Sequence, residues 1–169
     1  MRWRALILFC VGLLACTSGQ SNPNVREFSG DDPEMRAAID SARATVGFFL
    51  QRLAEPPASQ TYASLKLRFG DSTLGEHIWL DSVHFDGQKL HGQLDEDAVD
   101  FPDLKAGQWV SGSPDEISDW MIVDGGIVCG GFTSRVAREH MSGAERAEMD
   151  SALAWTGLIA WAPADSCQE

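Results

Sequence analysis

The residue best suited to acid–base chemistry in this chain is His77, together with two carboxylates. Glu76 precedes it, and Asp119 opens a later predicted hairpin. A neutral imidazole oriented by a carboxylate can act as a general base near pH 7. The pattern therefore permits a hydrolase-like reaction, with His77 as the base and Glu76 or Asp119 orienting it. The competing interpretation is structural, because a histidine beside a tryptophan is more often a hydrogen-bonded packing residue.

Nucleophile and metal chemistry find less support. The sequence contains no Gly-x-Ser-x-Gly motif, and its Gly-Gly-Phe-Thr turn lacks the lysine of a phosphate loop. A metal site needs three or four converging ligands. His84 is expected on the strand face opposite His77, while His91 and His140 lie on separate predicted elements. We therefore expect no metal and no other cofactor, and an enzyme is the less favoured class.

A binding site is the preferred hypothesis. Polar and aromatic residues cluster where predicted strands begin or end, and rigid aromatic side chains beside charged groups are typical of ligand or peptide recognition. Arg135 could hold a ligand carboxylate in a bidentate fork, or pair with Asp119 inside the fold. At least two of Trp79, Trp109 and Trp120 are expected in the core. The predicted recognition site comprises Glu76, His77, Trp79, Asp119, Trp120 and Arg135.

An amphipathic helix is predicted from Asp32 to about Leu53. Asp32 suits the N-cap and Pro33 the first helical position. Apolar residues recur at steps of three and four, which gives the helix one packing face. Pro56 and Pro57 end it.

From residue 61 to residue 132 the hydrophobic period changes to two, which is typical of strands. A strand is expected around 65–69 and a short one at 108–111. Asp-Gly turns predict two hairpins, 77–94 around Asp86-Gly87 and 118–132 around Asp124-Gly125. Helices should follow at 133–140 and, after a Ser142–Glu145 capping box, to about Trp155, with the apolar residues 158–161 docking on the domain.

This order of elements predicts an α+β fold. An N-terminal amphipathic helix should pack on a twisted antiparallel sheet of about five to six strands, with helical segments at the C-terminal end. After the signal and tether, residues 32–169 are expected to form a single domain, a length that suits one compact core.

Residues 1–15 predict a lipoprotein signal peptide. Arg2 and Arg4 precede an apolar run that is too short for a membrane span, which needs about 20 residues. The run ends in Leu13-Leu14-Ala15-Cys16, which resembles the bacterial lipobox. Cleavage before Cys16 would leave an acylated cysteine and a flexible tether over residues 16–31, rich in Ser, Asn and Gly.

Acyl chains on Cys16 would hold the protein to a membrane. Thr17, rather than an aspartate, follows the cysteine, which favours the outer membrane, facing the periplasm, in an envelope with two membranes. The net charge of −12 argues against nucleic acid as a partner. The expected partners are the membrane and an unknown small molecule or envelope protein.

Cys10 would leave with the cleaved signal peptide and Cys16 would carry lipid, so two cysteines remain. Cys129 and Cys167 form an even pair in an oxidising compartment, which favours a disulfide. The alternative is two unrelated thiols, because spacing alone does not establish the geometry of a bridge.

Several of these clusters together resemble the YegJ-like bacterial domain of unknown function, from about Asp32 to Met149. Asp95-Glu96-Asp97 stands where that family usually carries an Asn-Glu-Pro-like turn. The resemblance implies a domain identity but no reaction. Its carriers are Glu76-His77 with Trp79, the strand with Gly92, Leu104-Lys105 with Gly107 and Val110, Ile117 with Asp119-Trp120-Met121, and Gly130-Gly131 with Thr133 and Arg135.

Lipidation can be tested directly. Metabolic labelling with a fatty-acid analogue should mark the wild-type chain, and Cys16→Ser should lose the label because the acylated sulfur is gone. Cys10→Ser should keep it, since Cys10 leaves with the signal peptide. Globomycin should also block processing of the wild type. A Cys16→Ser protein that still carries label would contradict the lipobox assignment.

Overall fold

The computed structural model describes residues 32–71 and 73–163. The predicted signal peptide, the tether and Cys167 lie outside these residues. The elements, in chain order, are α1 (Pro33–Ala44), α2 (Val46–Ala54), β1 (Gln60–Gly70), β2 (Gly75–Phe85), β3 (Leu90–Leu94), β4 (Trp109–Gly112), the 3₁₀ turn η1 (Pro114–Glu116), β5 (Ile117–Asp124), β6 (Ile127–Gly130), α3 (Phe132–Glu139), α4 (Gly143–Leu153) and the 3₁₀ turn η2 (Ala154–Thr156).

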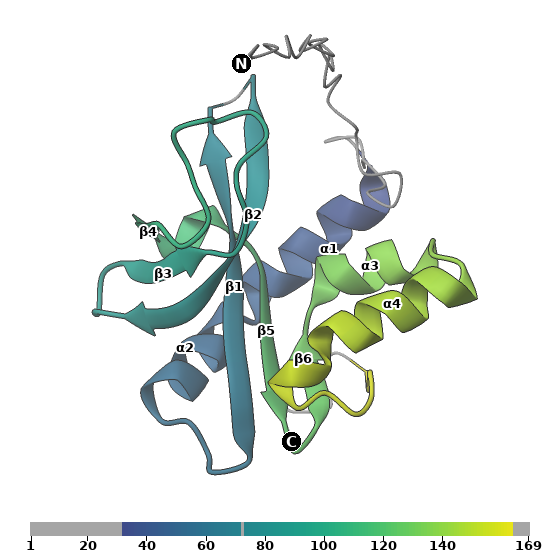
Figure 1. The fold of residues 1–169 in the computed structure, drawn as a ribbon. Coiled ribbons are helices and arrows are strands. Elements are labelled where there is room, and N and C mark those ends of the chain that lie inside the picture. The colour runs from purple at the N-terminus through teal and green to yellow at the C-terminus, as the bar shows by residue number, and fades with distance from the viewer. Residues whose placement is uncertain (1–31, 72, 164–169) are drawn as a thin grey trace, which may run out of the picture.

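The strands form one sheet in the order β4-β3-β2-β1-β5-β6, in which neighbouring strands run antiparallel (Figure 1). The prediction of an α+β fold with an antiparallel sheet of five to six strands is confirmed. β1 is central because it pairs with both β2 and β5 over most of its length. The side chains of these three strands therefore define both faces of the sheet.

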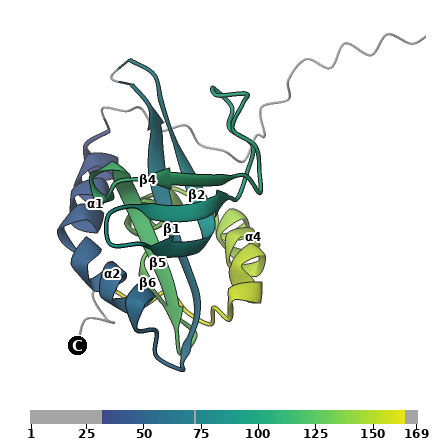
Figure 2. The ribbon, with the colours of Figure 1, turned by 90° about the vertical axis from the view of Figure 1, so that its left-hand side faces the viewer.

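Helices cover the two faces unequally. Figure 2 shows α1 and α2 on one side of the sheet and α4 on the other. The face toward α1 and α2, here called the core face, buries Leu65, Leu80 and Ile122 completely. On the opposite face, here called the α4 face, Met121 and Val123 pack with Leu158 and Trp161. The expected docking of the apolar C-terminal segment is thus confirmed.

The single N-terminal helix predicted up to Leu53 is wrong in one respect, because it is interrupted at Thr45. The hydroxyl of Thr45 donates back to the carbonyl of Ser41, at 2.8 Å. The indole of Trp120 donates to the carbonyl of Ala42, at 3.1 Å, and to the Thr45 hydroxyl, at 3.2 Å. An uninterrupted helix would direct the Ala42 carbonyl to the backbone N–H of Val46. In the structure the Ala42 carbonyl accepts from the buried indole and also from the backbone N–H of Thr45, at 3.3 Å, and the helix restarts as α2.

The two hairpins form where predicted, with different turns. Asp124 pairs with Ile127, so the second turn consists of Gly125 and Gly126, both with positive φ. A two-residue turn of this type requires positive φ at both central positions, which glycine adopts without strain. The strand also stops earlier than expected, because Phe132 already begins α3.

A bulge in β2 overturns one expectation about the histidines. The β2–β3 register shifts between Asp81 and His84, and Ser82 adopts a φ of 54°. An inserted residue reverses the alternation of the side chains that follow it. His84 therefore lies on the same face as His77, opposite His91 of β3, and not on the other face as predicted.

The Trp120 contact can be tested by unfolding in urea. Trp120→Phe should lower the free energy of unfolding by about 1–3 kcal/mol, because it removes the indole donor and part of a filled core volume. Trp155→Phe is the matched control: Trp155 is 70% exposed, and its replacement should change stability by less than about 0.5 kcal/mol. Equal effects of the two substitutions would show that the buried Trp120 indole contributes no more to stability than an exposed one.

Candidate functional site

Asp119 is the most completely hydrogen-bonded side chain of the predicted site. It is fully buried in β5 and accepts from the backbone N–H groups of Trp120, Phe132 and Thr133, at 2.8, 3.0 and 2.8 Å, and from the Thr133 hydroxyl, at 2.6 Å. Burial raises the pKa of the Asp119 carboxyl, and the Thr133 hydrogen bonds oppose that rise. The carboxylate thus caps the beginning of α3 and joins it to β5.

A glycine turn makes this cap possible. Gly130 and Gly131 have positive φ, which lets the chain reverse between β6 and α3. A Cβ added at Gly130 would lie 2.3 Å from the carbonyl oxygen of Trp120, so no other residue fits there without a shift of the backbone. The Gly-Gly motif therefore serves a close backbone approach within the fold.

Lys66 lies between Asp119 and Trp79 on the α4 face, in register with both. Its ammonium nitrogen is 3.3 Å from the Thr133 hydroxyl and 5.1 Å from the centre of the Trp79 ring. Burial lowers the pKa of Lys66, while Asp119 and then Glu96 act to raise it. The lysine thus forms a cation–π contact with Trp79 and neutralises part of the charge of Asp119.

Glu76 and His77 diverge, as strand alternation predicts. The Glu76 carboxylate accepts from the backbone N–H groups of Val99, at 2.9 Å, and Asp100, at 3.0 Å, and so fixes the loop between β3 and β4. His77 lies on the α4 face opposite Arg68 and is exposed. Partial burial of its ring, then the charges of Lys66, Arg68 and Arg43, lower the pKa of His77 to about 4.

The contacts of the described residues do not assemble the alternative catalytic pair. The carboxylates of Glu76 and Asp119 are held by backbone N–H groups and by Thr133. Among the hydrogen bonds between described residues, none joins either carboxylate to His77. The imidazole is neutral near pH 7, yet no carboxylate in the described part of the chain is hydrogen-bonded to it.

Trp120 and Arg135 lie away from the other predicted site residues. Trp120 follows Asp119 in a strand, so it points to the core face and stacks on Phe49 at 5.5 Å. The Arg135 guanidinium donates to the carbonyls of Gly130 and Val128, at 2.8 and 2.9 Å, and to that of Ala162. The structure thus brings His77, Trp79 and Asp119 to one face, and it does not bring all six predicted residues to one pocket.

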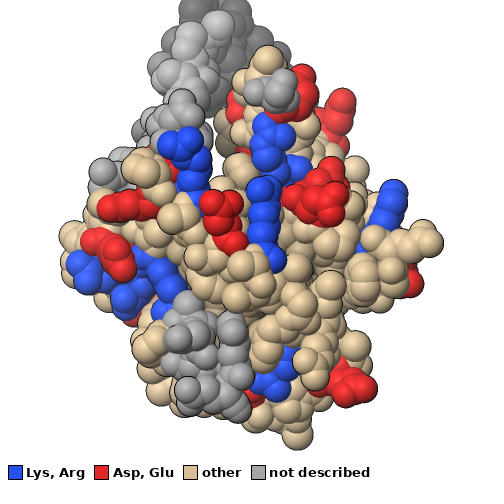
Figure 3. Space-filling model, turned by 180° about the vertical axis from the view of Figure 1, so that it is seen from behind, with Lys and Arg blue, Asp and Glu red and all other residues tan. Residues whose placement is uncertain are grey.

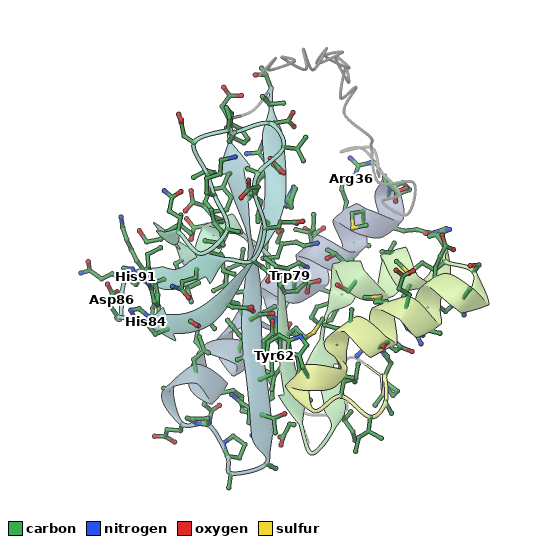
Figure 4. All side chains as sticks on the ribbon, viewed as in Figure 1. Arg36, Tyr62, Trp79, His84, Asp86 and His91 are labelled. Carbon is green, nitrogen blue, oxygen red and sulfur yellow. The ribbon has the colours of Figure 1, made fainter. Side chains whose placement is uncertain are left out.

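A pocket of about 190 Å³ lies between the α4 face and α4 itself. Trp79 is the predicted site residue that lines it. Figure 4 shows Tyr62 and Trp79 near the middle of the sheet, on the side of α4. The strand alternation beginning at residue 61 indicated Tyr62 and Ser64 as neighbours on one face, but nothing local in the sequence connects them to α4. The pocket is lined by Tyr62, Ser64, Trp79, Asp95, Met121, Ser134, Met149, Ala152 and Leu153.

One edge of this pocket carries the acidic residue Asp95, and Asp81 and Glu96 act on it from outside the lining. The Tyr62 hydroxyl donates to the Asp81 carboxylate, and burial, followed by that hydrogen bond, raises the pKa of Tyr62. The backbone N–H of Asp95 donates to the Trp79 carbonyl, at 3.0 Å, which fixes the start of the loop. Burial and then Asp81 raise the pKa of the Asp95 carboxyl. Burial and then Asp95 raise that of Glu96.

The histidines of the β2–β3 hairpin form a separate cluster at the far end of the sheet (Figure 4). His84 and His91 stack with ring centres 4.8 Å apart, and the Nε2 of His91 lies 2.8 Å from an Asp86 carboxylate oxygen. Within residues 32–71 and 73–163, no group of three or more His, Cys, Asp or Glu side chains could hold a metal ion. None of the helices in this part of the chain is both long and apolar enough to cross a bilayer.

The lowered pKa of His77 gives a pH prediction. The NMR titration of its imidazole should have a midpoint of about 4, so the ring stays neutral at pH 6. The unfolded chain, with a histidine pKa of about 6.5, binds the proton more readily, so this residue should lower the free energy of unfolding as the pH falls from about 6.5 toward 4. Lys66→Met should raise the His77 midpoint because it removes the charge that lowers this pKa most, whereas Lys105→Met should not. A midpoint that ignores Lys66 would refute the electrostatic cause.

Comparison with known proteins places the chain in a bacterial group without an assigned activity. Residues 32–156 match the family described as "Uncharacterized protein conserved in bacteria (DUF2314)". A putative ankyrin repeat protein of Neisseria meningitidis serogroup B is 34% identical over 130 residues, which cover 72% of this chain and 51% of that protein. This chain thus spans about half the length of that relative. No solved structure matches this chain.

The family match agrees with the expected domain of unknown function, while the narrower YegJ-like name stays a prediction. The matched residues run from the N-cap of α1 to the last residue of η2, and so include the α4 pocket and the Asp119 cap. The chain belongs to the bacterial DUF2314 family.

Proposed function

We propose that this protein is a non-catalytic binding module of the cell envelope, held to the membrane by acyl chains on Cys16. Its recognition site is the pocket between α4 and the sheet. Trp79 lines this pocket and also belongs to the recognition site predicted from the sequence. The observation that carries this proposal is the pocket itself: aromatic and methionine side chains line it, and polar groups stand at its edge. Such a composition is typical of binding sites.

The size of the pocket favours a macromolecular partner. Pockets that bury a whole small ligand have volumes of about 300–1,000 Å³. A cavity of about 190 Å³ instead accommodates one side chain or a small group that a larger molecule presents. Residues that fill such a pocket dominate the affinity of many protein interfaces. A protein of the envelope is therefore the preferred partner.

The name of the Neisseria relative points the same way. That protein is called a putative ankyrin repeat protein. Ankyrin repeats stack into extended surfaces that bind other molecules. A domain related to this chain thus occurs in a protein whose name implies binding, and this supports binding here as well.

The charged surface does not offer a stronger alternative. On the face turned away in Figure 1, acidic and basic side chains are interspersed and leave apolar and polar surface between them (Figure 3). A field of a single sign, which would steer a highly charged partner, does not dominate that face. The α4 pocket is the more specific feature.

The proposed location supplies the remaining parts of this assignment. A flexible tether over residues 16–31, as predicted from the sequence, would give a reach of roughly 20–25 Å between an acylated Cys16 and α1. In an envelope with two membranes, the domain would face the periplasm from the outer membrane. A Cys129–Cys167 disulfide suits that compartment: Cys129 is buried in β6, beside the segment in which the Val128 N–H donates to the Ala160 carbonyl, at 3.2 Å.

Site-specific photo-crosslinking in living cells tests the proposal. A photoreactive amino acid at Ala152, which lines the pocket and is solvent-accessible, should give a discrete crosslinked species. The same residue at Ala144, which is exposed on the same helix but outside the lining, is the matched control. Identical crosslinks at both positions, or none at Ala152 in the lipidated protein, would contradict recognition through this pocket.

A further inference from the structure

The α4 pocket combines aromatic walls with an acidic edge. Tyr62 and Trp79 form the walls on the sheet side, and Met121 and Met149 add polarisable thioethers. Asp95, the first residue after β3, supplies a solvent-accessible carboxylate. Aromatic faces attract cations through their quadrupole, and a carboxylate adds a charge-assisted hydrogen bond.

Further carboxylates make this edge more negative. Asp81 accepts the hydrogen bond of the Tyr62 hydroxyl and so lies at the hydroxyl end of that side chain. Asp81 acts on the Asp95 carboxyl, and Asp95 acts in turn on Glu96, so the three carboxylates form one interacting group. A group of like charges is stabilised when a cation enters it.

Lys66 neutralises this group only in part, because its charge acts on Glu96 and also on Asp119. Lys66 is directed to Thr133 and to the Trp79 ring, and the Asp119 carboxylate is its strongest electrostatic partner. Lys66 is not among the residues that line the pocket. Lys66 thus shares its one positive charge between Asp119 and Glu96, while Asp81 and Asp95 add two further carboxylates that act on each other.

The α4 pocket differs in charge from a second pocket of about 200 Å³, which is lined by Arg135, Arg138 and Arg146 together with Glu139 and Trp161. Among residues 32–71 and 73–163, no lysine or arginine lines the α4 pocket. The acidic edge is therefore a local property of this pocket and not only a result of the acidity of the whole chain.

We propose that the α4 pocket accepts the cationic end of a lysine or arginine side chain of a protein partner. The alkyl stem would pack against Tyr62, Trp79 and the methionines, and the charged end would reach the Asp95 carboxylate. This inference rests on the proposed function, because it names the chemistry that the pocket of that binding module recognises.

The experiment uses matched probes on the full mature protein. Nα-acetyl-lysine amide and Nα-acetyl-norleucine amide share an alkyl chain and differ in the ammonium group. The probes are titrated separately while the indole N–H signal of Trp79, assigned with Trp79→Phe, is followed by NMR. The lysine probe should bind at least about tenfold more tightly than the norleucine probe.

Two variants locate the effect. Asp95→Asn should remove most of the preference for the lysine probe and leave the affinity for norleucine unchanged, since the backbone bond from residue 95 to Trp79 persists. Asp97→Asn is the control from the same turn, because the Asp97 carboxylate binds the Lys105 ammonium and the Ala106 N–H outside the pocket. It should behave as the wild type does.

The outcomes separate this inference from the proposed function. Equal binding of both probes would overturn the cationic preference and leave an apolar recognition pocket in place. A preference that survives Asp95→Asn would overturn the role of Asp95. Absence of any shift at Trp79 with either probe would overturn the inference as well, while the crosslinking at Ala152 decides separately whether the pocket is a binding site.

Discussion

The hydrogen bonds to the Asp119 carboxylate determine how the two layers of helices meet the sheet. Asp119 points to the α4 face and caps α3, and the next residue, Trp120, points to the core face and interrupts the N-terminal helix at Thr45. Two consecutive residues of β5 thus position α3 and the N-terminal helices. Because the carboxylate is fully buried, removal of its donors would leave a desolvated charge, which is among the costliest changes a fold can suffer.

Local chemistry determined what could be predicted. The N-cap at Asp32, which accepts from Glu34 and Met35, and the capping box of Ser142 with Glu145 depend on neighbours within one turn, so the sequence displays them directly. The alternation along β1 and the first part of β2 also follows from local period. These features were sufficient for the α+β class, the hairpins and the position of His77 opposite Ile78 and Leu80 on β2.

The features that could not be predicted depend on residues far apart in the chain. The break at Thr45 needs the indole of a residue 75 positions later. The bulge at Ser82 arises from the register between β2 and β3, and it alone moves His84 to the face of His77. The α4 pocket needs Tyr62, Asp95 and Met149 from three separate elements. Rigid walls also come from such contacts, because Asp81 holds Tyr62 and Lys66 packs on Trp79, and walls that are already fixed lose little conformational entropy when a ligand binds.

The sheet and the loop between β3 and β4 contribute different parts of the binding surface, and Glu76 fixes the loop to the sheet. The Glu76 carboxylate accepts hydrogen bonds from the backbone N–H groups of Val99 and Asp100. These bonds do not depend on which side chains the loop carries. The aromatic walls belong to the sheet, and the acidic edge belongs to the loop that begins at Asp95. Evolution can therefore replace the Asp95-Glu96-Asp97 turn, and with it the sign of the charge that a partner meets, while the strands and their rings stay as they are. A common scaffold could in this way acquire different partners through three residues of one turn.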